Sequence, residues 1–585
     1  MDDETIVEEY FRLKEKSNEK FLQIGNLPRS GYRKWQPYFD RAFAVFTELW
    51  RFQQQYRESL SEQQVLKRHH IGEIASKIGQ LYYQYYLRTS NTAYLTETYC
   101  FYYAIRCRGY YDNAKTEKRP DFMVKKLRYL CRFILVCLVL ENGKLAAELM
   151  QDLSRDIADY EATYQPFDAA WWFRVADEIR SMLRAAQPLS LLDSDGRQLF
   201  LKRRLSPETS PPLTDFPALR APTGGTTQLP LRLADALIVG GCADQAKFSE
   251  LSVDMLRMSL ALEKQPPVAA GAGGGPAGLG DNPGSRQGAQ SPDGGLSESQ
   301  NPHKYLLYRP SLAEIVFSLN STFNDLPDDG VVLVYFSADG RRCQQRGKKE
   351  DSYSGYRDGG LAVQRSRESD KPGKPETRRL PGSGGVIRDS RCFYPGDMYC
   401  FTRKPVFLIV DSDNSTAFKK FPNLFNEPLV CLMSPEQIPS SVCPDGRQSG
   451  SLFTLFLHCP LSGMARLCGA NTVQLPAWER GLILMDGCLS EAGRLLLQHK
   501  EVDPAYQCFF RDDFLRALLL RFLFCCLALR LHRDFQPPRC YPTAHPALPD
   551  DLLDVDSVQA KVLDLAELFD ARDLFCEAAD YSRDL

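Results

Sequence analysis

The run of residues 405–415, PVFLIVDSDNS, constrains the fold of this 585-residue chain more than any other segment. Five consecutive large or β-branched apolar residues lead into a carboxylate and a small polar turn. Such an uninterrupted apolar run is typical of a strand buried on both faces of a parallel sheet, and α/β folds place their chemistry at the carboxyl ends of these strands. The sequence therefore predicts a parallel sheet with Asp411, Asp413 and Ser415 at its carboxyl edge.

These three side chains suggest either a phosphatase that forms an acyl phosphate or a metal-binding adhesion domain. A phosphatase also needs a distant lysine and a later carboxylate pair that holds magnesium. The later acidic pairs, Asp512–Asp513 and Asp550–Asp551, lie in a helical pattern and in a proline-flanked loop, and neither follows a strand. We therefore interpret the segment as a strand end followed by a helix N-cap. The enzymatic alternative is a magnesium-dependent phosphatase that uses Asp411 and Asp413.

The other sequence patterns that could indicate catalysis, phosphate binding or metal binding are incomplete. Gly240–Gly241 follows the apolar run ALIV, but the Lys-Ser/Thr of a phosphate-binding P-loop is missing, so we favour a tight strand-to-helix turn. The eighteen cysteines contain no CxxC pair, and no two histidines have metal-site spacing. We predict no catalytic residue, no metal ligand and no cofactor, and we expect the histidines to be surface or cap residues: His69, His70, His303, His458, His499, His532 and His545.

The composition and the N-terminal residues indicate what class of protein this is. A net charge of −2 and 43% apolar residues describe an ordinary soluble protein. Scattered cysteines in apolar helical patterns suit a reducing compartment. The acidic start MDDETIVEEY predicts no secretory or transit peptide. Residues 514–531 are strongly apolar but contain Arg516, Arg521 and Arg530, so we expect a buried amphipathic helix with snorkelling arginines rather than a membrane span.

Apolar periodicity divides the chain into regions. Residues 1–185 have helical spacing with short polar turns at 89–91 and 141–143, which predicts an antiparallel helical array similar to tetratricopeptide repeats. Later strand and helix patterns alternate, which favours an open, mostly parallel α/β sheet with a helical C-terminal region. The predicted regions are a helical array at 1–185, a hairpin and Pro-rich connector at 186–232, an α/β domain at 233–505, and C-terminal helices packing on that domain at 506–585.

Within the α/β domain, we expect strands at 236–241, 331–337, 405–411 and 428–433, and helices that include 247–263 and 311–326. Residues 265–301 are dominated by Gly, Pro, Ser, Ala and Gln, and residues 339–391 are rich in Gly, Arg, Lys, Asp and Ser. Because such segments bury too little apolar surface to offset the entropy of ordering, we predict that both inserts are disordered.

An aromatic and basic segment allows a second functional alternative. Its aromatic side chains include Tyr82, Tyr83, Tyr85, Tyr86, Tyr102 and Tyr103, and the next helix carries Lys125, Lys126, Arg128 and Arg132. Interleaved aromatics and cations can bind single-stranded nucleic acid. Because the tyrosines recur at helical spacing, we favour a helical core with a solvated face. A protein-binding groove along the same array stays open.

Several long strings resemble the suppressor of cancer cell invasion (SCAI) family, in the same order and over nearly the whole chain. They include YRKWQPYFDRAFAVFTELWRFQQQ (32–55), VKKLRYLCRFILVCLVL (124–140), LADALIVGGCADQAKFSELSVDMLRM (233–258), YPGDMYCFTRKPVFLIVDSDNS (394–415) and GSLFTLFLHCPL (450–461). The divergent stretches fall in the two inserts and the Pro-rich connector.

This resemblance implies a transcriptional cofactor without enzymatic activity, located in the nucleus and the cytoplasm. Animal members of the family repress transcription driven by myocardin-related transcription factors with serum response factor, downstream of Rho–formin signalling, and take part in double-strand-break repair. The partners that the resemblance implies are therefore transcription factors and DNA-repair mediator proteins. No catalytic residue carries over.

Overall fold

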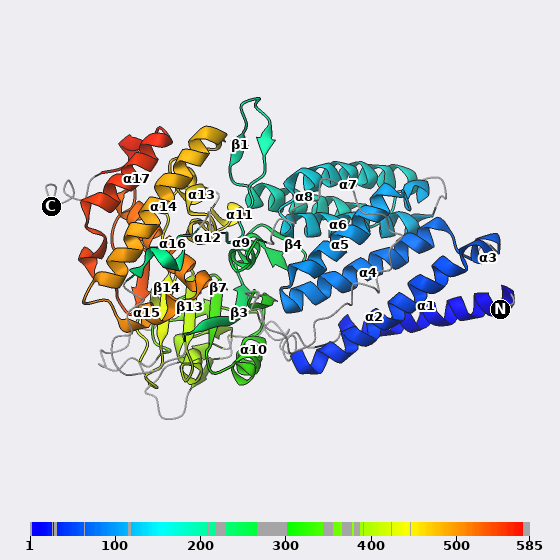
Figure 1. Ribbon diagram of the computed structural model, residues 1–585, viewed down its shortest axis with the longest axis horizontal. Helices are drawn as coiled ribbons and strands as arrows, with labels where there is room; N and C mark the ends of the chain where they lie inside the picture. The colour runs from blue at the N-terminus through cyan, green and yellow to red at the C-terminus, as the bar shows by residue number, and fades with distance from the viewer. Residues whose placement is uncertain are drawn as a thin grey trace. The chain divides into compact units, whose positions relative to one another are not determined.

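The computed structural model divides into two compact units (Figure 1). The helical unit comprises Met1–Ala176 with Gln265–Asn301, and the sheet unit comprises Asp177–Lys264 with Pro302–Leu585. The structure describes residues 3–25, 27, 32–63, 65–114, 119–206, 210–217, 230–265, 301–342, 355–364, 377–379, 387–389, 391–422, 424–444 and 446–576. The predicted disorder at 265–301 therefore falls almost wholly outside the described residues.

The helical unit is built from helix hairpins, in which α1 packs on α2, α4 on α5, and α6 on α7. Its helices are α1 (Asp3–Gly25), α2 (Tyr32–Gln55), α3 (Arg57–Glu62), α4 (Arg68–Thr89), α5 (Thr92–Cys107), the 3-10 turn η1 (Asp112–Ala114), α6 (Pro120–Val139) and α7 (Gly143–Tyr164). The next helix, α8 (Ala169–Ala186), contains the boundary between the two units.

The two predicted turns are confirmed, and side-chain caps explain them. Asn91 Oδ1 accepts a hydrogen bond from the Ala93 amide (3.0 Å) at the start of α5, and Asn142 Oδ1 accepts one from Leu145 (3.2 Å) at the start of α7. The preceding residues, Ser90 and Glu141, have φ values of 56° and 57°. This left-handed backbone ends the preceding helix and lets the chain reverse.

The sheet unit is organised around a six-stranded sheet in which each strand is parallel to its neighbours except for β16, which is antiparallel to β14. The strand order is β16 (Thr543–His545), β14 (Leu429–Met433), β13 (Val406–Asp411), β7 (Gly330–Ser337), β3 (Arg232–Gly240) and β6 (His303–Tyr308). The four predicted strands are confirmed as β3, β7, β13 and β14. The two edge strands, β6 and β16, were not predicted.

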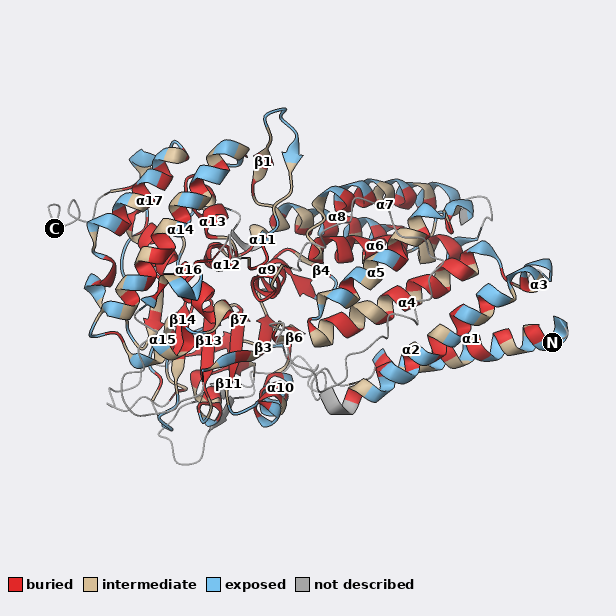
Figure 2. Ribbon diagram, viewed as in Figure 1, coloured by how far each residue is buried: buried red, intermediate tan, exposed pale blue. Residues whose placement is uncertain are grey.

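Both faces of the central strands are covered, as Figure 2 shows by their uniform burial. One face carries Val334, Phe336 and Leu408, which pack in a core with α10 (Leu312–Asp325) and the 3-10 segments η5 (Pro395–Phe401) and η6 (Ser415–Phe418). On the opposite face, the ring of Phe407 lies 5.5 Å from that of Phe509. The helices in the layer on this opposite face are α9 (Val253–Ala261), α12 (Leu452–His458), α15 (Pro504–Phe509) and α16 (Asp513–Leu531).

The predicted helix at 247–263 is wrong in its first half. Strands β4 (Lys247–Phe248) and β5 (Leu251–Ser252) form a small hairpin there, and α9 begins only at Val253. Two local features account for this start. Ser249 has a positive φ of 57°, which no helix interior allows, and Ser252 Oγ accepts a hydrogen bond from the Met255 amide (3.4 Å) as the N-cap.

Part of the second predicted disordered insert is ordered. Within 339–391, β8 (Gly340–Arg341) and β9 (Gly360–Ala362) pair with each other, and β9 also pairs with β12 (Cys392–Phe393). Two further short strands, β10 (Thr377–Arg379) and β11 (Ile387–Asp389), pair as a hairpin. The prediction was wrong for β8 and β9 because Leu361 of β9, which is fully buried in the sheet core, supplies an apolar anchor amid polar residues. The rest of this insert lies outside the described residues.

The predicted hairpin near 189–205 is confirmed as β1 (Ser190–Leu192) and β2 (Gln198–Leu199), with Gly196 at a φ of 74° in the turn. Strand β1 also pairs in parallel with β15 (Thr472–Gln474). The remaining elements are η2 (Leu213–Asp215), α11 (Gly446–Ser449), α13 (Pro460–Leu467), α14 (Leu475–Gln498), η7 (Asp550–Leu553), α17 (Asp556–Leu568) and η8 (Arg572–Leu574).

Helix α16 is buried along almost its whole length, and the prediction of snorkelling arginines is wrong for Arg516 and Arg521, which are buried, whereas Arg530 is partly exposed. The Arg521 guanidinium donates to the carbonyls of Leu457 (3.0 Å) and His458 (3.1 Å), the last two residues of α12. Those carbonyls have no hydrogen-bond partner within their own helix, so the buried Arg521 side chain supplies the donors that the C-terminal end of α12 lacks. No described helix has the combination of length and apolar character that a membrane span requires.

Candidate functional site

The strand order selects one position as the candidate site. In chain order, the strands β3, β6, β7, β13 and β14 have the spatial order 2-1-3-4-5, so the chain leaves β3 toward β6 on one side and continues from β7 on the other. In open α/β sheets, ligands bind outside the carboxyl ends of the strands at such a switch point. The strands end here at Gly240, Ser337 and Asp411, which are adjacent in the sheet register.

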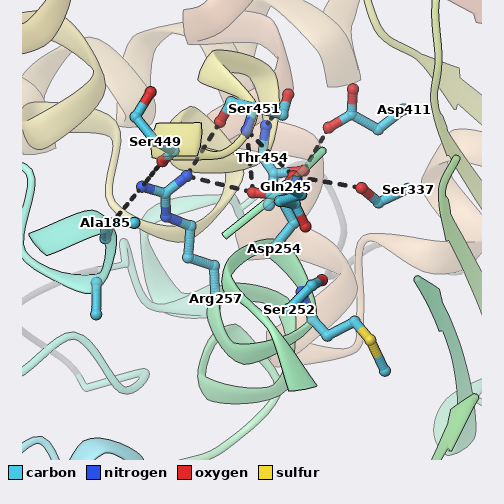
Figure 3. A network of polar contacts seen from close by, with 12 residues as sticks. Ala185, Gln245, Ser252, Asp254, Arg257, Ser337, Asp411, Ser449, Ser451 and Thr454 are labelled. Atoms are coloured by element: carbon cyan, nitrogen blue, oxygen red, sulfur yellow. Dashed lines mark hydrogen bonds and ion pairs between the residues drawn. The ribbon is translucent and has the colours of Figure 1, made fainter. Parts of the chain in front are cut away.

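A buried ion pair from α9 lies at this edge (Figure 3). The Arg257 guanidinium lies 3.2 Å from Asp254 Oδ1, and the two side chains are 2% and 0% exposed. Arg257 also donates to three backbone carbonyls, those of Ala185 (2.9 Å), Ser449 (2.9 Å) and Ser451 (3.3 Å). The guanidinium therefore ties α9 to the end of α8 and to the loop before α12.

The Asp254 carboxylate accepts further hydrogen bonds from the surrounding elements. The Ser451 amide lies 3.1 Å from each of its oxygens, the Ser337 hydroxyl donates from 3.3 Å, and the Gln245 side-chain amide also donates. Gly240 makes the approach of α9 possible, because a Cβ there would lie 2.4 Å from Met255 Sδ. The switch point is thus filled by side chains of the same chain.

Asp411, the strongest enzymatic candidate, belongs to this buried network. Its Oδ2 accepts a hydrogen bond from the Thr454 hydroxyl (2.6 Å), which is itself 2.6 Å from the Tyr335 hydroxyl. Burial raises the pKa of Asp411 to about 7, and the nearby charge of Asp254 adds to the shift. A catalytic nucleophile must reach its substrate, whereas Asp411 is 9% exposed and bonded to the protein interior.

Asp413 and Ser415 do not join Asp411 in one site. Asp413 is exposed and its Oδ1 accepts a hydrogen bond from the Gly340 amide (2.5 Å), which fixes the turn into β8. Ser415 is buried and donates to the Ser434 carbonyl (2.7 Å). The predicted helix near residue 416 is the short 3-10 segment η6.

The later acidic pairs have structural roles in other parts of the chain. Asp512 is the N-cap of α16 and accepts from the amides of Phe514 (2.9 Å) and Leu515 (3.0 Å), while Asp513 pairs with Lys264 at 2.6 Å. Asp551 lies 3.4 Å from His499. Within the described ranges, no group of three or more His, Cys, Asp or Glu side chains could hold a metal ion.

The histidines divide between cap positions and the interior. His499 and His532 are the C-caps of α14 and α16, as predicted for this residue type. The prediction of surface or cap positions was wrong for His69, in the first turn of α4, and for His458, the last residue of α12, because their side chains are buried at 6% and 1% exposed. Burial holds the pKa of His458 well below its usual value, and the charges of nearby arginines add to the shift. This imidazole is therefore neutral in the folded chain.

The Gly240–Gly241 turn differs from the prediction, because the chain does not enter a helix directly after it. Residues 242–246 and the β4–β5 hairpin intervene before α9. Above the turn, a Cβ on Gly241 would lie 3.2 Å from Ala338 Cβ and 3.3 Å from the Ala362 carbonyl of β9. The small sheet of β8, β9 and β12 therefore packs closely against the place where a phosphate loop would bind its ligand.

The aromatic and basic residues of the helical unit pack as a core rather than as an open groove. Tyr102 is 1% exposed, and its carbonyl accepts a hydrogen bond from the Tyr129 hydroxyl (2.9 Å). Two of the predicted cations are held by carboxylates, Lys125 by Glu73 (2.9 Å) and Lys126 by Asp156 (2.8 Å). These contacts support the core interpretation over a stacking platform for nucleic acid.

Asp254 and Arg257, which organise the network, were missed in the sequence. Their signal was present, since VDMLRMSLA places an acid and a base three residues apart in an otherwise apolar helix. Charges at positions of a buried helix are almost never found without a partner. That pattern predicts an interior ion pair, although it does not say which strand ends the pair meets.

Comparison with known proteins assigns the family. The model for "Protein SCAI" matches residues 12–535. Protein SCAI from Homo sapiens and from Mus musculus are each 40% identical over 572 residues, covering 98% of this chain and 89% of the relative. A Protein SCAI homolog from Dictyostelium discoideum is 30% identical over 723 residues, covering 97% of this chain and 91% of the relative. No solved structure matches. The chain therefore belongs to the SCAI family, as its sequence strings predicted.

Proposed function

We propose that this protein is a non-enzymatic scaffold that represses transcription by joining transcription factor complexes, as the SCAI resemblance implies. The observation that carries the proposal is the 40% identity to Protein SCAI over 98% of the chain. The proposed targets are myocardin-related transcription factors with serum response factor, downstream of Rho signalling. A second proposed role is in double-strand-break repair, through contacts with mediator proteins in the nucleus, and the proposed location is nucleus and cytoplasm.

The carboxyl edge of the sheet supports a role without catalysis. The side chains of Asp254, Arg257 and Asp411 form their hydrogen bonds within the chain, and each is less than 10% exposed. An active site of an α/β fold would need free polar groups at this edge. The network instead stabilises the packing of α9 and α12 on the sheet, as expected of a rigid scaffold.

The helical unit is the proposed docking surface. Stacked helix hairpins form elongated surfaces that bind peptides and proteins in tetratricopeptide-like arrays. At the start of α8, Phe167 is fully exposed and Trp171 is 49% exposed. Large aromatic side chains such as these are enriched among the residues that dominate binding energy in protein interfaces. We propose that they contact a partner.

The test is repression of a reporter gene driven by serum response elements, in cells that lack their own SCAI protein. Re-expression of this chain should lower the stimulated reporter signal, and Phe167→Ala with Trp171→Ala should weaken the repression at equal protein level. The matched control is Phe317→Ala on α10, another exposed aromatic (60%) in the sheet unit. Absence of any repression by the wild-type chain would contradict the proposed transcriptional role.

A separate experiment addresses catalysis. The purified protein should not hydrolyse an aryl phosphate above background, with or without magnesium. In the reporter assay, Asp411→Asn should repress as well as the wild type, because its carboxylate is interior. Magnesium-dependent hydrolysis that Asp411→Asn abolishes would show that the phosphatase alternative is correct.

A further inference from the structure

Two lysines of the helical unit pair with one carboxylate, and a third lysine on α1 lies close enough to interact with them electrostatically. Glu73 on α4 lies 3.2 Å from the ammonium of Lys77 on the same helix and 2.9 Å from that of Lys125 on α6. Lys77 also donates to Asn18 Oδ1 of α1 (2.8 Å). Lys14, one turn earlier on α1, packs its ammonium 5.8 Å from the ring of Tyr10. We call Lys14, Lys77 and Lys125 the lysine cluster.

The lysine cluster has more positive charge than its carboxylate neutralises. The three ammoniums and the Glu73 carboxylate, counted by themselves, have a net charge of about +2. The pKa of Lys14 is lowered, first by burial and further by the charges of Lys77 and Lys125, although Glu73 opposes the shift. The pKa of Glu73 falls to about 2, because hydrogen bonds and charges from Lys125 and Lys77 outweigh its burial. The cations therefore repel one another across the helices.

A buried donor without a partner lies beside this charge. The Tyr10 side chain is 0% exposed, and its hydroxyl has no hydrogen-bond partner among the described residues. Burial raises the pKa of Tyr10 to about 12, and the negative charge of Glu73 contributes to the shift, so the hydroxyl remains a donor. A buried hydroxyl without a partner is destabilising, so an acceptor group bound next to it would stabilise the folded unit.

We propose that the lysine cluster and the Tyr10 hydroxyl bind a phosphate monoester or free phosphate dianion at the junction of α1, α4 and α6. Solvent reaches the cluster, since the side chains of Lys77 and Lys125 are 27% and 41% exposed. Separate ammoniums act as point charges and suit a tetrahedral anion, whereas the paired oxygens of a carboxylate match the fork of an arginine. A monoester dianion also matches the net charge better than the single charge of a nucleic-acid diester.

A purely structural role for the cluster makes a different prediction. If the lysines only tie three helices to Glu73, removing Glu73 would destabilise the unit and leave anion affinity unchanged. If the cluster binds a dianion, Glu73→Gln removes the one repulsive carboxylate and should tighten phosphate binding. Both roles allow some loss of stability, so this variant separates them through its phosphate affinity, which should be unchanged in the first case and tighter in the second.

The first measurement is thermal unfolding of the full chain in sodium phosphate and in sodium chloride of equal ionic strength. Ligand binding to the folded state raises the unfolding temperature by mass action. Phosphate should give the higher temperature for the wild type. In Lys14→Gln with Lys125→Gln, titration calorimetry should show the phosphate Kd raised at least about tenfold. If this double variant fails to fold, Lys125→Gln alone, which removes the most exposed ammonium, replaces it.

The matched control is Lys16→Gln with Lys144→Gln. These lysines lie on α1 and α7 of the same unit, and the pair removes the same charge, but Lys16 pairs with Glu48 at 3.8 Å and Lys144 is exposed. The control should keep the wild-type phosphate affinity. An equal loss in the control, or no difference between phosphate and chloride for the wild type, would overturn the proposal.

Two further titrations identify the source of the phosphoryl group. A phosphoserine peptide that binds more tightly than inorganic phosphate, with no binding of the unmodified peptide, assigns the site to a phosphorylated protein. Equal affinity for both assigns it to the free anion. A single-stranded oligonucleotide that binds through Lys14 and Lys125, in a protein that does not respond to phosphate, would show instead that the cluster recognises a nucleic-acid backbone.

Discussion

The polar network of the sheet unit and the lysine cluster of the helical unit contain the same chemistry in opposite surroundings. In the first, Asp254 and Arg257 are 0% and 2% exposed, and each forms several hydrogen bonds to other parts of the chain. In the second, Glu73 is 22% exposed and is shared by Lys77 and Lys125, with a third ammonium nearby. One group is closed to solvent, and the other is partly exposed and has an excess of positive charge.

This difference indicates how the chain separates stability from recognition. A buried charge pair depends on each partner, because removal of one leaves the other without solvent or counter-charge. A partly exposed pair is screened by water and salt, so it contributes little to stability but can exchange its partners. The carboxyl edge of the sheet, where α/β folds usually bind ligands, is thus filled by structural contacts, while the anion site that we propose lies on the helical unit.

Of these substitutions, Asp254→Asn should lower the stability of the protein most, because it disrupts the buried polar network of the sheet unit. The change leaves the Arg257 guanidinium buried beside a neutral amide, so we expect the free energy of unfolding to fall by about 3–5 kcal/mol. Urea denaturation followed by circular dichroism measures this loss. Asp195→Asn is the control, because its pair with Arg197 has side chains that are 63% and 78% exposed. The control should change stability by less than about 1 kcal/mol. Equal effects of the two substitutions would refute the contrast.

The closed network also predicts an unusual pH dependence through Asp411. Its pKa is about 7 in the folded chain and near 3.9 when unfolded, so between these values the folded state binds the extra proton. Stability therefore falls as the pH rises toward 7, and the loss is complete above that value. From pH 5.5 to pH 8 we expect Asp411 to lower the free energy of unfolding by about 2 kcal/mol.

Comparison of the wild type with Asp411→Asn checks this dependence. The amide cannot ionise but still offers an oxygen to Thr454, so the variant should gain stability relative to the wild type as the pH rises. The difference between the two unfolding free energies is measured at each pH in urea. Parallel curves for the two proteins would mean that Asp411 does not titrate in this range.

The central strands were predictable because their physical signal is local. Uninterrupted apolar runs such as VVLVYFS (331–337) are required wherever both faces of a sheet are covered, and β7 has no exposed residue. The edge strand β6, HKYLLY, mixes buried and partly exposed residues and follows a long insert, so it lacked that signal. Strand β16 has three residues and is specified by its pairing with β14 rather than by its own sequence.

The candidate site was less predictable because it depends on contacts distant in the sequence. Asp411 was identified as a strand-end carboxylate, but its burial follows from Thr454, 43 residues later, and from Asp254, which lies on another element. The aromatic segment of α4 and α5 was correctly assigned to a core, since tyrosine spacing reports one helix face. Which lysines would meet around Glu73 could not be deduced, because α1, α4 and α6 are brought together by tertiary packing.

Glu73→Gln should have the smallest effect on stability, and this effect should depend on salt concentration, unlike that of Asp254→Asn. At low salt, we expect a loss of about 1 kcal/mol, because the carboxylate reduces repulsion among three ammoniums that solvent partly screens. At about 1 M salt the screening length is only about 3 Å, so this loss should largely disappear. The loss caused by Asp254→Asn should persist in the same salt, because ions cannot enter the interior. Urea denaturation at both salt concentrations measures the two responses, and a salt-independent effect of Glu73→Gln would place the lysine cluster among the closed, structural ion pairs.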